Sequence, residues 1–235
     1  MLHLPEITLL SIDCFTPERT LLSAIRSQQW VKFGAWILFT DTSKFHIQHP
    51  GLRVIDRKES TKKVTVGNLR PFPVDYELDV NRLPATVLET SHMLFMEWDA
   101  GVLNPEGWNE RFMEYDYIGA PWPDHTDPGW PPCNETNNVG NGGFALKSKR
   151  FCVLTRTTLD EHPDDPQAVC SDAWACRTMR PKFESLGMKY APEDVAFQFS
   201  TENRIYVNSF GFHGRVTCAL NNWGGAWLGN IRPKP

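Results

Sequence analysis

The chain has 235 residues, of which 41% are hydrophobic, and its formal net charge at pH 7 is −4. A chain of this size can bury a substantial core, and we expect one domain over residues 1–235. The small acidic excess argues against a general nucleic-acid-binding protein, because neutralising phosphates needs clustered Lys and Arg.

The first residues, MLHLPEITLLSIDCF, are interpreted as a strand centred on Ile7–Ile12. They lack the basic start and the small-residue cleavage site of a signal peptide. No apolar run approaches the ~20 residues that a membrane span needs. We therefore expect a cytoplasmic protein without a membrane span, in which the six cysteines are reduced thiols.

A helix and two strands are predicted to follow in chain order. Thr16-Pro17 is a typical helix start, and the helix runs to about Gln29. Apolar, β-rich runs predict strands at Phe33–Phe39 and Leu52–Ile55. This order is typical of the nucleotide-binding half of an α/β fold.

The middle of the chain continues the alternation of helices and strands. We expect a helix over Arg82–Thr90, despite its internal Pro84, and then a strand over Met93–Met96 that is buried on both faces. Residues 121–139 are rich in Pro and Asn and have no period, which is typical of a lid or binding loop. The remaining predicted elements are the short helix Pro105–Glu114, the extended piece Tyr117–Gly119, the strand Phe144–Lys147, and the helices Lys149–Thr158 and Asp172–Lys182.

Two carboxylates, Glu97 and Asp99, follow the strand Met93–Met96 and precede the small pair Ala100-Gly101. Alternate residues of a strand point to the same side, so both carboxylates can face one ligand. A carboxylate pair at the end of a strand suits a divalent metal that holds a diphosphate. The alternative is that Asp99 only caps the turn that follows.

Three glycines surround Asn141 in the segment Val139–Phe144, so the backbone and one amide can approach a ligand closely. A tight turn into the strand at Phe144 explains the same glycines equally well. Together with the carboxylate pair, this loop indicates an enzyme that acts on nucleotide sugars.

From about residue 74 onward, the chain resembles a family of poorly characterised domains with a glycosyltransferase-A-like fold. The segments that carry the resemblance are Trp98-Asp99, Leu103–Glu106 with Trp108, Tyr115–Trp122, Val139–Ser148, Ala191-Pro192, Ala196, Phe199-Ser200, Glu202 and Phe210–Gly214. The resemblance implies a single-domain α/β fold with a Rossmann-like nucleotide-binding half and a mixed sheet. It also implies a glycosyltransferase.

The resemblance implies a metal site for Mn²⁺ or Mg²⁺ at Asp99 and Glu97, completed by His213 near the C-terminus. A purely structural role is the alternative for His213. The family has Asp-Gly-aromatic where this chain has Asp99-Ala100-Gly101, and this difference bears on which donor fits.

Asp172 is the candidate catalytic base, because the family has an acidic pair at a helix start where this chain has Ser171-Asp172. An inverting transfer needs a carboxylate that accepts the proton of the acceptor hydroxyl. The alternative is that Asp172 only stabilises the N-terminus of the helix. Glu193, in the pair Glu193-Asp194, is the rival base.

Further residues are candidates for binding the donor or the acceptor. Asp13 ends the first strand, where folds of this kind contact the base or the ribose, and capping of the following helix is the alternative. Lys147 and Arg150 are candidate phosphate contacts, although solvated surface charge explains them as well. Trp122 and Tyr117 are candidates for the wall of the pocket, although core packing is the favoured role of Tyr117. The complete set of candidate binding residues is Asp13, Trp98, Asn141, Gly142, Gly143, Trp122 and Lys147.

We therefore expect a metal-dependent, hexosyltransferase-type enzyme that moves a sugar from a nucleotide-diphosphate donor, such as a UDP-sugar, to a hydroxyl acceptor. Inversion is favoured because a base candidate exists. The acceptor is a glycan, a lipid-linked precursor or a modified DNA base. The alternatives are a catalytically inert nucleotide-sugar- or glycan-binding module, and a sugar-phosphate hydrolase.

Overall fold

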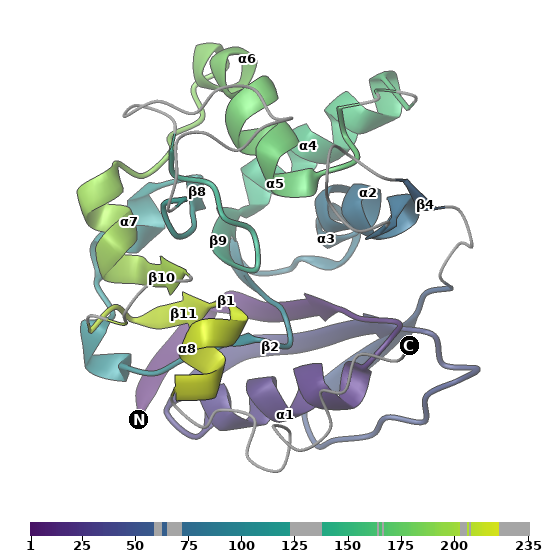
Figure 1. Ribbon diagram of the computed structural model, residues 1–235, viewed down its shortest axis with the longest axis vertical. Coiled ribbons are helices and arrows are strands. Elements are labelled where there is room, and N and C mark those ends of the chain that lie inside the picture. Colours follow the sequence, from purple (N-terminus) through teal and green to yellow (C-terminus); the bar gives the residue numbers. More distant parts are fainter. Residues whose placement is uncertain are drawn as a thin grey trace.

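The computed structural model describes residues 1–58, 63–64, 72–122, 138–163, 165, 167–202, 206 and 208–220. Its centre is a six-stranded sheet with the strand order β3-β2-β1-β6-β9-β8 (Figure 1). The strands are β1 (Leu2–Ile12), β2 (Val31–Thr40), β3 (Leu52–Asp56), β6 (His92–Met96), β8 (Tyr117–Ile118) and β9 (Phe144–Ser148). Strands β3, β2, β1 and β6 are parallel, whereas β9 is antiparallel to both β6 and β8. The predicted mixed sheet is therefore confirmed.

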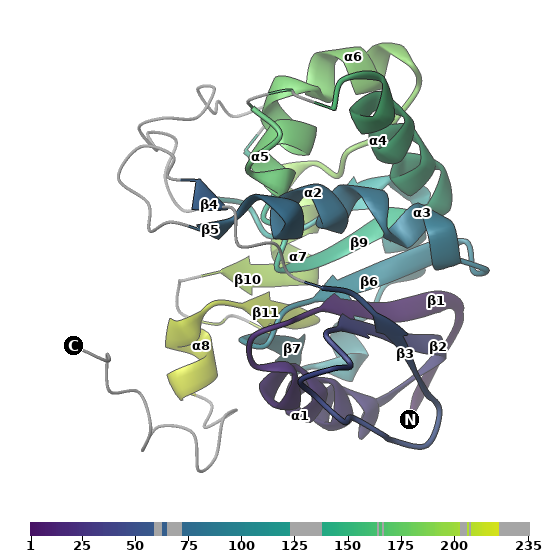
Figure 2. The same ribbon diagram turned by 90° about the vertical axis from the view of Figure 1, so that its right-hand side faces the viewer.

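Helices cover both faces of this sheet, as Figure 2 shows. Helix α1 (Pro17–Gln28) lies on one face, and α2 (Val74–Arg82), α3 (Pro84–Val87) and α4 (Lys149–Glu161) lie on the other. The remaining helical segments are the 3-10 turns η1 (Pro105–Gly107) and η2 (Glu110–Glu114), α5 (Ser171–Ala173), the π-helical turn η3 (Trp174–Thr178), α6 (Arg180–Ser185), α7 (Glu193–Phe199) and α8 (Arg215–Leu220).

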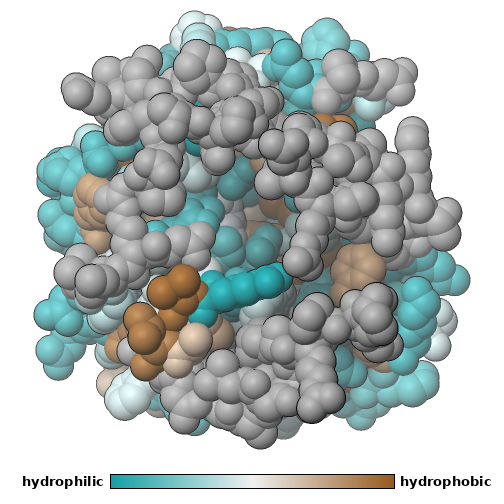
Figure 3. All heavy atoms as spheres, viewed as in Figure 1, coloured by the Kyte–Doolittle hydropathy of each residue, from teal (hydrophilic) through white to brown (hydrophobic). Residues whose placement is uncertain are grey.

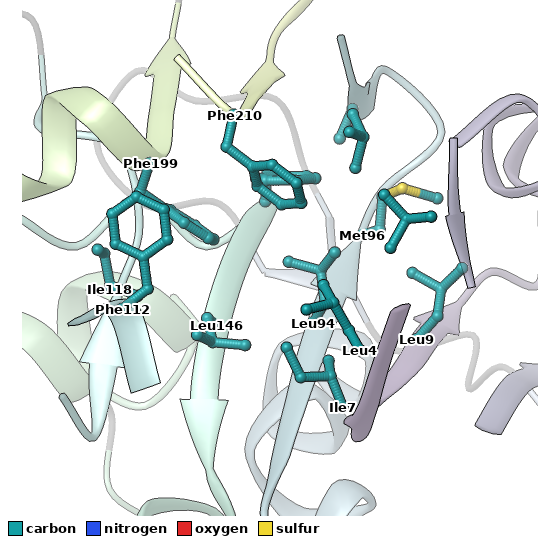
Figure 4. Packing of buried hydrophobic residues seen from close by; sticks show 14 of the residues in the cluster. Leu4, Ile7, Leu9, Leu94, Met96, Phe112, Ile118, Leu146, Phe199 and Phe210 are labelled. Carbon is teal, nitrogen blue, oxygen red and sulfur yellow. The ribbon is translucent and has the colours of Figure 1, made fainter. Parts of the chain in front are cut away.

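Alternating side chains of the central strands pack into two different core clusters. Leu9 and Leu94 belong to the cluster on the α1 side, part of which is drawn in Figure 4. Leu10 and Phe95 belong to the cluster on the α2 and α4 side. Every residue of β6 is buried, as expected for a strand covered on both faces.

Two smaller sheets complete the fold. Strands β10 (Ser200–Glu202), β11 (Gly211–His213) and β7 (Ala100–Val102) form a three-stranded sheet in that order, and β4 (Lys63–Val64) pairs with β5 (Phe72–Pro73). Within the three-stranded sheet, β11 is parallel to β10 and antiparallel to β7. This pairing joins the chain near residue 100 to the chain near residue 212.

The predicted helix over Arg82–Thr90 is wrong. Helix α2 ends at Arg82, and Pro84 starts the separate four-residue helix α3, after which Leu88 is extended. Proline lacks the N–H that a continuous helix needs, but it is well placed at a first helical position. The helix α2 itself was not predicted. Of the predicted binding loop over 121–139, residues 123–137 lie outside the described residues.

Two further observations concern the cysteines and the length of the helices, within the residues that the structure describes. The free cysteines are Cys14, Cys152, Cys170, Cys176 and Cys218. Within the described ranges, none of the helices combines the length and the hydropathy that a membrane crossing requires.

Candidate functional site

A tight turn between β6 and β7 carries the two carboxylates predicted to act together. Strand β6 ends at Met96, and the N–H of Ala100 donates a hydrogen bond to the carbonyl of Glu97 at 3.2 Å. Glu97 and Asp99 therefore approach each other through this turn, not through the alternation of side chains along a strand. The predicted proximity is correct, but the predicted geometric reason is wrong.

His213 reaches the same turn from the other end of the chain. In the antiparallel pair β7–β11, His213 lies opposite Ala100, and the N–H of Gly214 donates to the carbonyl of Asp99 at 3.0 Å. The imidazole Nε2 lies 3.4 Å from Glu97 Oε2 and 3.4 Å from Asp99 Oδ1. One ligand atom from each of these three residues lies within 4.8 Å of the others.

The chemistry of this Glu97–Asp99–His213 cluster fits a divalent cation. Asp99 Oδ1 is buried and accepts no hydrogen bond, and a buried carboxylate oxygen needs a proton donor or a cation. Carboxylate oxygens and an imidazole nitrogen are common ligands of first-row divalent metals. The described residues therefore include a cluster that could bind a metal.

Burial alone would lower the pKa of His213, but the carboxylates of Asp99, Glu202 and Glu97 outweigh burial and raise this pKa well above its ordinary value. The ring's second nitrogen, Nδ1, lies 3.3 Å from Glu202 Oε1 in β10. Glu202 thus faces Nδ1, which is the ring nitrogen on the side away from Glu97 and Asp99. A carboxylate in this position can orient a metal-binding histidine.

The glycine loop before β9 lies directly against the cluster. The carbonyl of Gly143 accepts the N–H of Glu97 at 2.9 Å, and Asn141 Oδ1 accepts the N–H of Gly143 at 3.3 Å. A Cβ atom at Gly143 would lie 2.2 Å from His213 Nε2. Only glycine at this position therefore leaves room for the imidazole.

Asp172, at the start of α5, is attached to the same loop. Its Oδ2 accepts the N–H of Gly142 at 3.1 Å, and its Oδ1 accepts the N–H of Ala173 at 2.7 Å. These contacts satisfy the helix start, and they also hold the carboxylate beside the predicted glycine loop. The rival acid Glu193 lies in the first turn of α7, and in the described part of the chain no hydrogen bond joins it to this loop.

A cleft of ≈ 440 Å³ adjoins the cluster and shares Glu97 with it. Its walls come from β1, α1, α2, the turn after β6 and α8, and include Asp13, Glu77, Trp98 and Arg215. The Arg215 guanidinium lies 5.4 Å from the centre of the Trp98 ring. On the face of the molecule that Figure 3 shows, the middle is hollowed, and hydrophilic side chains together with some hydrophobic ones lie at its bottom.

Asp13 both lines the cleft and stabilises the start of α1. Its Oδ1 accepts the N–H groups of Phe15 and Thr16, each at 2.8 Å, and its Oδ2 accepts the Thr20 hydroxyl at 2.6 Å. Asp13 therefore caps the start of α1, which was its alternative role, and it also lines the cleft.

The sequence did not point to Arg215 as a residue of the cleft, and Tyr76 and Glu77 were missed because helix α2 was not predicted. The Tyr76 hydroxyl donates to Glu97 Oε1 at 2.7 Å, and Glu77 Oε2 accepts the N–H of Ser171 at 2.8 Å. Burial, followed by the nearby carboxylates of Asp172 and Glu97, raises the pKa of Glu77 to about 7. The signal that could have found them is the pair of acidic residues in the first turn of α2.

Several predicted binding residues lie beneath the surface. Lys147 is buried in β9, and its ammonium lies 5.5 Å and 5.6 Å from the ring centres of Phe95 and Tyr117. Tyr117 is a core residue whose hydroxyl donates to the carbonyl of Gly140 at 2.7 Å. Trp122 is also buried.

Arg150, by contrast, is exposed and forms an ion pair with Asp116. Of the two roles considered for Arg150, the structure therefore shows a surface ion pair and no contact with the cleft.

The strand order, the helices on both faces and the cluster at the end of β6 define a glycosyltransferase-A-like α/β fold. Among solved structures, the chain is similar to the crystal structure of a glycosyltransferase involved in the glycosylation of the major capsid of PBCV-1. The TM-score is 0.53 at 10% sequence identity, and the match covers 94% of this chain and 98% of that chain. At this identity, the similarity concerns the fold.

Residues 82–213 match the family model described as protein of unknown function, DUF5672, and the chain belongs to this family. This range contains Glu97, Asp99 and His213. Among curated proteins, no match to this chain was found.

Proposed function

We propose that this protein is a metal-dependent glycosyltransferase that transfers a hexose from a nucleotide-diphosphate sugar, with a UDP-sugar as the first candidate, to a hydroxyl acceptor. The observation that carries the proposal is the Glu97–Asp99–His213 cluster, which shares Glu97 with the adjoining cleft. Residues 1–235 would act as one domain.

Glu97, Asp99 and His213 would hold Mn²⁺ or Mg²⁺. When bound, the metal would offset the negative charge of the donor diphosphate and of the departing nucleotide. Among the described residues, Asp99 Oδ1 accepts no hydrogen bond and lies 3.4 Å from His213 Nε2, which supports this assignment. The Tyr76 hydroxyl would fix the orientation of the Glu97 carboxylate.

The donor would lie in the cleft, where Asp13, Trp98 and Arg215 are available to it. Trp98 offers an aromatic face, and Arg215 offers a cation for the diphosphate. Asn141, Gly142 and Gly143 would border the transferred sugar or the acceptor on the other side of the cluster.

Asp172 would be the general base that takes the proton of the acceptor hydroxyl, as an inverting transfer requires. Its hydrogen bond from the N–H of Gly142 supports this choice over Glu193, because it holds the carboxylate at the loop next to the cluster. Trp122 and Lys147 would support the loop from below, since both are buried.

The test combines thermal stability with nucleotide release, using UDP-, GDP-, CDP- and TDP-sugars with and without Mn²⁺. A ligand at ~100-fold excess over its Kd adds about 2.7 kcal/mol of stability, which a thermal scan detects. The correct donor and Mn²⁺ together should raise the Tm by more than the sum of their separate effects, because the metal offsets repulsion between phosphates and carboxylates. Nucleotide release in the same sample should accompany this rise.

Each outcome separates the candidate functions. A Tm rise without nucleotide release would favour an inert binding module, and release of free sugar without acceptor would favour a sugar-phosphate hydrolase. Neither a rise nor release with any donor would refute the proposal. Glu106→Gln, on the exposed turn η1, is the matched control for charge loss and should behave as the wild type.

A further inference from the structure

Two arginines that the proposed transfer does not use are buried in the helical segment that begins with Asp172. Arg177 lies in the π-helical turn η3 and is 5% exposed, and Arg180 starts α6 and is 8% exposed. Arginine is seldom buried without a partner, because taking its charge out of water is costly. The two residues therefore need an explanation.

The Arg177 guanidinium has an aromatic neighbour, and among the described residues it has no hydrogen-bond acceptor. Its central carbon lies 3.9 Å from the centre of the Trp122 ring. Among the described residues, no carboxylate or carbonyl accepts a hydrogen bond from it, and its Nε is fully buried. A guanidinium has five N–H donors, so this side chain leaves most of its hydrogen-bonding capacity unused.

Arg180 repeats the arrangement three residues later. Its guanidinium lies 4.4 Å from the centre of the Tyr190 ring, and its Nε donates to Glu184 Oε1 at 2.8 Å. Its Nη1 is buried and has no acceptor in the described part of the chain. Each of the two guanidinium groups is thus stacked on a ring, and each keeps at least one buried donor without an acceptor.

Arg177 lies close to the glycine loop on the proposed acceptor side of the site. A Cβ atom at Gly140 would lie 2.1 Å from the Trp122 ring and 2.6 Å from the Cβ of Cys176, the residue next to Arg177. Gly140 is two residues before Gly142, whose N–H binds Asp172. A short path of contacts therefore joins Arg177 to the proposed catalytic base.

The backbone between Asp172 and Arg180 is also unusual. The N–H of Met179 donates to the carbonyl of Trp174 at 2.8 Å, five residues back, which is the π-helical pattern. Single π-helical turns are rare and occur frequently at functional sites.

We propose that Arg177, together with Arg180, binds an anionic group of the acceptor, either a phosphate or a carboxylate. Guanidinium groups bind both anions through paired, charge-assisted hydrogen bonds. This inference rests on the proposed function, since it assigns a chemical class to the acceptor of that reaction.

The experiment measures anion binding without metal, nucleotide or transfer, so that it does not depend on the glycosyltransferase assignment. The Tm of the full chain is recorded in EDTA against increasing sodium phosphate, sodium acetate, and sodium chloride at matched ionic strength. The variant is Arg177→Met, which removes the charge and keeps an unbranched, flexible side chain. The control is Arg156→Met on the exposed side of α4.

Phosphate, acetate or both should raise the wild-type Tm above the chloride series. Arg177→Met should weaken the apparent affinity at least about tenfold, as expected for a lost charged hydrogen bond, and Arg156→Met should not. The anion that acts identifies the acceptor group as phosphate or carboxylate.

Without anion, Arg177→Met should be at least as stable as the wild type, because it removes an unpaired buried charge. The inference is overturned if no anion exceeds chloride, or if Arg177→Met keeps the full response. Should this variant fail to fold, Arg180→Gln is judged by the same two criteria. Nucleotide release by the wild type reports separately on the proposed function.

Discussion

Gly143→Ala is a sharp test of the cluster, because it changes neither a charge nor a hydrogen-bonding side chain. The described glycines with positive φ are Gly51, Gly187 and Gly214, so the backbone at Gly143 accepts alanine. The new Cβ would lie 2.2 Å from His213 Nε2, whereas ordinary contacts begin at 3.4 Å. An imidazole in ordinary contact with this Cβ would lie about 1.2 Å farther away than it does now.

A displacement of this size would take Nε2 out of reach of a metal that Glu97 and Asp99 hold. Misplacing a catalytic group by 1 Å can cost ~10²-fold in rate, and we expect a loss of about that size in transfer. The Mn²⁺ concentration for half-saturation should rise by about 10- to 100-fold. Nucleotide release and the Mn²⁺-dependent rise of Tm measure the two effects separately.

Gly142→Ala is the matched control one residue away. Its Cβ would lie 3.0 Å from the Cβ of Asp172, and its three nearest neighbours would all be atoms of Asp172. It should slow transfer without changing the Mn²⁺ titration. The reasoning is refuted if folded Gly143→Ala binds Mn²⁺ as the wild type does.

Three further predictions concern single carboxylates. Asp99→Asn keeps the volume of the side chain and should lower turnover by orders of magnitude with a weaker Mn²⁺ dependence; full activity with an unchanged metal titration would exclude Asp99 as a ligand. Asp172→Asn should keep donor and metal affinity and lose transfer by ~10²–10⁴-fold, whereas an inactive Glu193→Gln beside an active Asp172→Asn would show that Glu193 is the base. Glu77 has a folded-state pKa of about 7, above its ordinary 4.5, so the folded state holds this proton more tightly than the unfolded chain does. The free energy by which the raised pKa of Glu77 stabilises the folded state is therefore fully present below pH 4.5 and is lost as the pH rises to about 7. Glu77→Gln should lack this loss and be more stable than the wild type by up to about 3 kcal/mol at pH 8 in urea unfolding, and identical pH profiles would contradict the assignment.

The amino-acid sequence determined the elements whose formation depends on neighbours along the chain. The apolar run of β6 required burial on both faces, and Pro17 marked the first turn of α1. The glycines around Asn141 indicated a close approach of the backbone. These features follow from local propensity and periodicity, which act over a few residues.

Local signals failed where a proline was ambiguous. Pro84 was predicted to lie inside one helix, but it begins the separate helix α3 after helix α2 has ended at Arg82. Because helix α2 was not predicted, Tyr76 and Glu77 were not recognised as residues of the cleft. The neighbouring residues are compatible with both arrangements, so packing against the sheet decided between them.

Only the tertiary structure decided which side chains meet. His213 joins Glu97 and Asp99 because β11 pairs with β7, more than a hundred residues earlier in the chain. Arg177 stacks on Trp122, more than fifty residues earlier in the chain, because the segments that carry them pack together in the folded protein. Such contacts depend on strand order and on the packing of distant elements, and no periodicity within either segment specifies its partner.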